Sequence, residues 1–81
     1  MDTREVRPLN PASTGACLMQ ALDAQYAADI SKALATIDIY MASPVGIGEH
    51  PQHLEEVDKL LEAIATAQDK RDALKRYYSW S

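Results

Sequence analysis

Three residues in the middle of the chain are of types that can hold a metal ion. Glu49, His50 and His53 stand together, and a His-x-x-His spacing places both imidazole rings on one face of a helix. Pro51 interrupts the pair, so we expect His50 just before a helix and His53 in its first turn. A metal site needs three or four converging ligands, and the sequence offers no fourth nearby. The pattern favours ordinary loop and helix-cap histidines, and no metal site is predicted.

The single cysteine is the one candidate nucleophile. Cys17 falls at the expected start of a long helix, a position that can activate a thiol. Catalysis also needs a base beside the sulfur, and both histidines are predicted at the other end of that helix. We therefore expect Cys17 to be a small buried residue, and the protein not to be an enzyme.

Two glycines close to the histidines raise the question of a phosphate-binding loop. Gly46 and Gly48 lack the third glycine, the lysine and the preceding strand of such a motif. We interpret them as backbone features of a tight connection, and no cofactor is predicted. Val45 and Ile47 lie in the same tip, where they either fold back to close a hairpin or contact a partner.

The C-terminal segment interleaves basic and aromatic residues, which can bind single-stranded nucleic acid by stacking and phosphate contacts. Its members are Lys70, Arg71, Lys75, Arg76, Tyr77, Tyr78 and Trp80. Asp69 and Asp72 dilute the positive charge, and the whole chain has a net charge of −4, so binding to nucleic acid is not expected. Because Tyr, Trp and Arg dominate protein interfaces, we interpret the segment as a protein-docking element. The alternative is that a tyrosine covers the open end of a hairpin while Trp80 stays in solvent.

These candidates lie on a chain of 81 residues, which allows one small domain. A chain of this size buries only about 60% of its unfolded surface, and one cysteine excludes an internal disulfide. Stability must then come from very regular packing or from a partner chain. The apolar stretches are far shorter than the roughly 20 residues of a membrane span, and no secretion signal is seen. We expect no contact with a membrane.

The elements that position the candidates follow from turn residues and periodicity. Residues 1–15, with Pro8 and Pro11, are expected to form an extended arm. A helix over about 14–43 is predicted to begin at a Ser13 or Thr14 cap and to stop before Pro44. Its apolar stripe is Met19, Leu22, Tyr26, Ile30, Ala33, Ile37 and Met41. Alanines also gather along this helix, either for helix propensity alone or as a second close-packing face.

A second helix is predicted over about 51–78, beginning at Pro51. Its apolar stripe is Leu54, Val57, Leu61, Ile64, Ala67, Leu74 and Tyr78, with Leu60 on the flank. A short connection joins the two helices, so the predicted fold is all-α: an antiparallel two-helix hairpin over 16–81 with an extended N-terminal arm and a short aromatic C-terminal tail.

The connection carries a resemblance. The string from Met41 to Pro51, which reads Met-Ala-Ser-Pro-Val-Gly-Ile-Gly-Glu-His-Pro, is followed by a helix containing Ala67-Gln68-Asp69-Lys70. Over roughly residues 26–76 the chain resembles short helical-hairpin proteins encoded by tailed phages, notably those of marine bacteria. The resemblance implies a phage context, in the virion or the host cytoplasm, and implies no activity. The arm and the Tyr-Tyr-Ser-Trp-Ser tail lie outside it.

Together these observations predict a non-enzymatic structural or interaction protein, in the phage context a virion accessory such as a capsid-decoration or head-assembly subunit. The alternative is a small regulatory adaptor that binds a host or phage protein through a helical face. The expected partner is a protein, either a capsid or other virion protein or a second copy of this chain. The residues predicted to contact it are Val6, Leu9, Val45, Ile47, Arg71, Arg76, Tyr77, Tyr78 and Trp80.

Overall fold

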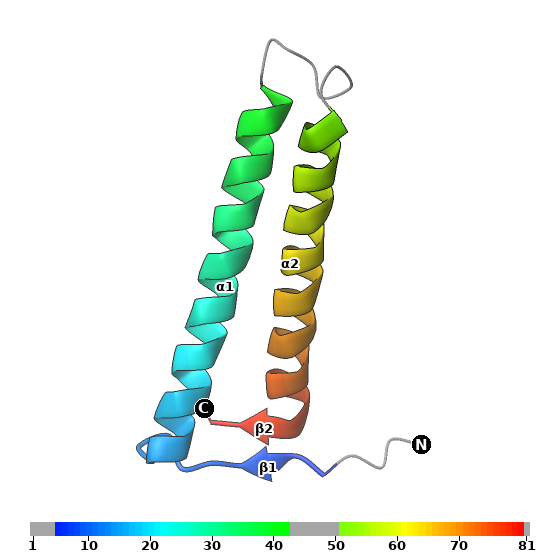
Figure 1. Ribbon diagram of the computed structural model, residues 1–81. Helices are drawn as coiled ribbons and strands as arrows, with labels where there is room; N and C mark the ends of the chain where they lie inside the picture. Colours follow the sequence, from blue (N-terminus) through cyan, green and yellow to red (C-terminus); the bar gives the residue numbers. More distant parts are fainter. Residues whose placement is uncertain (1–4, 43–50, 81) are drawn as a thin grey trace.

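The computed structural model describes residues 5–42 and 51–80, and Figure 1 shows two long helices side by side with the strands β1 and β2 at one end of the pair. The elements in chain order are β1 (Arg7–Pro8), α1 (Thr14–Met41), α2 (Pro51–Tyr77) and β2 (Tyr78–Ser79). The helices run antiparallel and pack along their length, so the predicted all-α hairpin is confirmed. The predicted helix ranges are right to within two residues at each end.

The start of α1 is fixed by a turn and a cap. The Asn10 side chain accepts a hydrogen bond from the Ala12 amide at 3.0 Å, and the Asn10 carbonyl accepts one from the Ser13 amide at 2.8 Å. Ser13 is extended (φ −79°, ψ 159°), and its hydroxyl accepts from the Ala16 amide at 3.1 Å. The prediction of a cap at Ser13 or Thr14 is thus confirmed at Ser13.

The seam between the helices contains the few buried side chains. Ala16, Ala33, Ile37 and Ala67 are the buried members of the described hydrophobic residues. Three of the four are alanines, and small side chains let two helix backbones approach closely. Half-buried residues continue the seam on both sides: Met19, Leu22, Tyr26 and Ile30 on α1, and Val57, Leu60, Ile64 and Leu74 on α2.

The predicted stripes are wrong at three positions. Met41, Leu54 and Leu61 were expected in the seam and are instead 63%, 56% and 53% exposed. On α2 the seam is rotated, so that His53 and Leu60 face α1 in place of Leu54 and Leu61. Apolar periodicity cannot choose between adjacent rows of a helix when both rows are apolar.

The arm and the tail pair with each other across the open end of the hairpin. β1 and β2 form a parallel two-stranded sheet, with Arg7 opposite Tyr78 and Pro8 opposite Ser79. The Leu9 amide extends the ladder with a 2.7 Å hydrogen bond to the Ser79 carbonyl. Figure 1 shows the two strands lying across the base of the helices. The expected extended arm is confirmed over this stretch, and its pairing with the tail was not predicted.

Candidate functional site

The paired termini bring together most of the residues predicted to contact a partner. We call this region the terminal clasp: residues 6–9 of the arm and residues 76–80, which comprise the end of α2 and the tail. The Arg7 guanidinium lies 5.7 Å from the centre of the Tyr78 ring, a cation–π contact across the two strands. Leu9, Tyr78 and Trp80 are half-buried, so their rings and methyl groups are partly used within the molecule. The clasp thus has an intramolecular role. Tyr78 takes part in it, as in the alternative that a tyrosine covers the open end of the hairpin, but Trp80 is half-buried rather than left in solvent.

Arg71 lies above the clasp and is engaged by α1. Its Nε donates a 2.8 Å hydrogen bond to Asp23 Oδ1, in an ion pair that joins the two helices. This hydrogen bond, aided by the positive charge of Arg71 and Lys75, lowers the pKa of the Asp23 carboxyl, and desolvation only partly opposes it. The same hydrogen bond raises the pKa of Arg71. Arg71 therefore tethers the helices at this end, a role in addition to the predicted partner contact.

The accessible part of the clasp has an apolar and a cationic component. Val6 is 51% exposed and Tyr77 is 37% exposed. Each directly precedes a member of the Arg7–Tyr78 pair, Val6 in the arm and Tyr77 as the last residue of α2. Arg76 is exposed beside Tyr77, where both line a shallow hollow with Asp69, Asp72 and Ala73. The clasp thus presents a tyrosine, an arginine and a valine from two paired segments, and Tyr and Arg are typical interface anchors.

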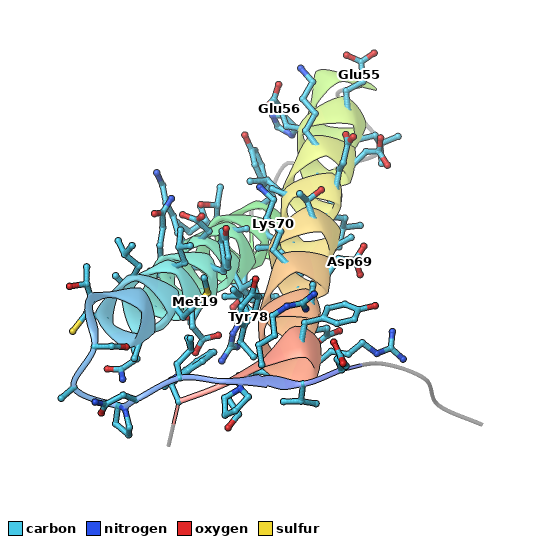
Figure 2. All side chains as sticks on the ribbon, turned by 90° about the horizontal axis from the view of Figure 1, so that it is seen from below. Met19, Glu55, Glu56, Asp69, Lys70 and Tyr78 are labelled. Carbon is cyan, nitrogen blue, oxygen red and sulfur yellow. The ribbon has the colours of Figure 1, made fainter. Side chains whose placement is uncertain are left out.

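A second surface is the groove along one side of the seam, which carries charges of both signs. Its charged residues are Asp29, Lys32, Lys59, Glu62 and Lys70. Lys70 Nζ lies 5.5 Å from the centre of the Tyr26 ring. Figure 2 shows Lys70 on the side of α2 toward α1, whereas Asp69 lies on the far side. The alternation of lysines and carboxylates gives this groove little net charge, so it does not resemble a site for phosphates.

The candidate nucleophile and the candidate metal ligands do not form a catalytic or metal site among the described residues. Cys17 is exposed, so the prediction that it is buried is wrong; it follows buried Ala16 by one residue and is therefore turned about 100° away from the seam. His53 packs against Tyr40, with ring centres 5.2 Å apart. Within the described ranges, no group of three or more His, Cys, Asp or Glu residues is placed to hold a metal ion. The predictions for residues 43–50, including Val45, Gly46, Ile47, Gly48 and His50, lie outside the described residues.

Sequence reasoning missed two contacts that order the hairpin, Asp23 with Arg71 and Tyr40 with His53. Each pairs a residue of α1 with a residue of α2 at the same height, and their numbers add to nearly the same value. A search for complementary residues related by one such sum could have found both. In this part of the chain, neither helix is long and apolar enough to cross a membrane.

The fold and this site define a small helical hairpin closed by paired termini. In the comparisons with known proteins, no family model, no curated protein and no solved structure matches the chain. What the protein does must therefore be inferred from its surfaces.

Proposed function

We propose that the protein is a non-enzymatic structural or interaction protein, in phage context a virion accessory of the capsid-decoration or head-assembly kind. The observation that supports this proposal best is the accessible part of the clasp. Arg76 and Tyr77 lie in the last turn of α2, and Val6 directly precedes β1, so the helix and the strand pairing next to them hold these residues in place rather than on a free tail. A preordered anchor loses less conformational entropy on binding than a flexible one.

The phage context comes from the resemblance of the helix–connection–helix region. Under this proposal the protein acts in the virion or the host cytoplasm, and its partner is a capsid protein or another virion protein. The clasp docks on that partner with Tyr77 as the apolar anchor and Arg76 as the cationic neighbour.

The test of the context is quantitative mass spectrometry of purified particles of a phage that encodes this chain. A virion accessory is expected at a fixed and high copy number relative to the major capsid protein. Presence in infected cells together with absence from purified particles would overturn the virion assignment. It would favour the alternative, a regulatory adaptor that acts through a helical face.

The test of the clasp uses two surface substitutions, Arg76→Ala and Tyr77→Ala, which leave β2 in place. We expect at least a tenfold loss of binding to particles lacking the native protein, with unchanged helicity by circular dichroism. Lys59→Ala is the matched control, because Lys59 is also an exposed basic residue of α2 but lies far from the clasp and is paired with Glu56 at 3.6 Å. Binding by the double variant at wild-type strength would exclude the clasp as the docking element.

A further inference from the structure

One face of the hairpin carries an unpartnered row of large apolar side chains, which we call the apolar face. Leu34 and Met41 on α1, and Leu54 and Leu61 on α2, are between 48% and 63% exposed. The two residues on each helix are seven positions apart, so each pair lies on one row two turns long. By helical periodicity both rows lie on the same side of the seam, opposite the groove that contains Lys70.

The two rows are aligned in height as well as in direction. Contacts across the seam join residues whose numbers add to about 95, as in Tyr40–His53 and Tyr26–Lys70. By that register Leu34 is level with Leu61, and Met41 is level with Leu54. The apolar face is therefore built of two matched layers, each with one large side chain from α1 and one from α2.

Both helices also show the spacing of a bundle core. Apolar residues recur at intervals of three and four, as Ala27, Ile30, Leu34, Ile37 and Met41 on α1 and as Leu54, Val57, Leu61 and Ile64 on α2. This is the a/d repeat of coiled coils and four-helix bundles. In the hairpin alone, Ile30, Ile37, Val57 and Ile64 pack toward the seam. Of the alternate residues, Ala27 is half-buried, whereas Leu34, Met41, Leu54 and Leu61 remain exposed.

The chain exposes more surface than a compact monomer of its mass. A compact monomer of 8.9 kDa exposes about 4,800 Å², whereas the 81 residues together expose 5891 Å². The chain is also a single layer of helices, with extents of 51 × 31 × 14 Å.

We infer that the apolar face packs on the same face of a second copy, which forms a four-helix bundle. A two-fold axis parallel to the helices places α1 of one copy over α2 of the other, with the Met41 ends of both copies together. This arrangement sets Leu34 against the second copy's Leu61, and Met41 against its Leu54, because those residues share a level. A two-fold interface needs a self-complementary surface, and the matched layers provide one.

The rim of the apolar face carries negative charge, which affects how the dimer responds to salt. Asp38 and Asp58 are exposed, and each directly follows an inward residue of the repeat, Ile37 or Val57. In the bundle Asp38 of one copy lies at the level of Asp58 in the second copy, so like charges face each other across the rim. Added salt therefore tightens the dimer, and Asp38→Asn tightens it by about three- to tenfold at low salt. The rest of the α1 rim is small, with Ala24 and Ser31 at the equivalent positions.

The first experiment is sedimentation equilibrium of the full chain. We expect a dimer at micromolar concentration, with a melting temperature that rises with protein concentration because folding and association are linked. Leu61→Lys places two charges in each dimer interface, and its dissociation constant should rise by about 100-fold or more. Ile39→Lys is the control: Ile39 is 72% exposed on the back of α1, so dimerisation should be unchanged. A folded wild-type monomer at about 100 μM would overturn the inference, even if Leu61→Lys fails to fold.

The second experiment tests the arrangement. In a Cys17→Ser background, a spin label at Glu55→Cys marks the far end of α2 (Figure 2). With the Met41 ends together, the label-to-label distance between copies is about 20–30 Å; with the copies reversed it approaches the helix length of about 40 Å. The longer distance would overturn this arrangement, and weaker association at high salt would overturn the acidic rim. The inference does not depend on the proposed virion function, because dimerisation is measured on the purified protein without particles.

Discussion

The two ends of the hairpin are held together by different kinds of interaction. At the terminal end, the contacts are directional: the strand pairing of Arg7–Pro8 with Tyr78–Ser79, and the Asp23–Arg71 ion pair. Toward the other end, the described contacts are mainly apolar, with Ile37 buried and Tyr40 stacked near His53.

The difference shows how a chain with so small a core sets its register. Hydrogen bonds and ion pairs need specific distances and angles, so the terminal end fixes which residues of α1 and α2 lie level. Apolar packing is not directional, so it provides stability without selecting one height. It also leaves the apolar face exposed on the half of the hairpin that lacks directional contacts.

The largest loss of stability is expected from a substitution in the apolar half of the hairpin. Ile37 is 9% exposed in the seam, and truncation to alanine removes buried methyl groups and leaves space that the helices cannot easily fill. We expect Ile37→Ala to lower the free energy of unfolding by about 2–4 kcal/mol, measured by urea denaturation at a fixed protein concentration.

Ile39→Ala is the matched control for this substitution. The same atoms are removed two positions away, where the side chain is 72% exposed, and the expected change is within about 0.5 kcal/mol. Equal losses for the two variants would show that the seam is not where the structure places it.

The next largest loss of stability is expected from a substitution in the terminal clasp. Tyr78 is half-buried under Arg7 and takes part in the strand pairing, so Tyr78→Ala should cost about 1–2 kcal/mol, less than truncation of a fully buried ring. Trp80 is the single tryptophan and lines a hollow with Lys75, Tyr78 and Ser79. Its fluorescence emission should shift to the red as the clasp opens.

Helicity provides the contrast within the same variant. Because the helices do not depend on the clasp for their own hydrogen bonds, circular dichroism in native buffer should change little. A large loss of helicity on Tyr78→Ala would mean that the clasp holds the hairpin together, and that the two ends are not independent.

A smaller, pH-dependent effect is expected for the ion pair. The pKa of Asp23 is lowered in the folded protein, mainly by the Arg71 hydrogen bond, so the ionised carboxylate stabilises the fold. This contribution is complete above the ordinary carboxyl value of 3.8 and is lost as pH falls through the lower folded value. Asp23→Asn should therefore lower the melting temperature at pH 6, and the difference from wild type should shrink below pH 3.8.

Asp69→Asn is the control for this effect. Asp69 is exposed on the side of α2 away from α1 (Figure 2), so its substitution should leave the melting temperature nearly unchanged at both pH values. A difference between Asp23→Asn and wild type that is the same at pH 3 as at pH 6 would indicate a packing effect rather than a charge effect.

How well a feature of this fold can be predicted depends on how far apart in the sequence the interacting residues are. Helix ends depend on local signals such as the Ser13 cap, and these were read correctly from the sequence. The rotation of α2 was not predicted. Leu54, Leu61 and Leu60 are all apolar, and only tertiary packing selects which of their rows faces α1. The pairing of β1 with β2 joins residues about 70 positions apart through two residues each, and such a short ladder has no periodic signal in the sequence.

The smallest change in stability is expected at the first turn of α1, where the arm meets the helix. Gly15 lies within the helix, and a Cβ there would meet Leu9 Cδ2 and Ser13 Oγ at 3.9 Å each, which is ordinary van der Waals distance. Alanine is favoured over glycine in a helix because it loses less backbone entropy. Gly15→Ala should therefore raise the free energy of unfolding by about 0.5 kcal/mol. A decrease, together with a red shift of Trp80 emission, would show that the arm at Leu9 needs to approach α1 more closely than this structure indicates.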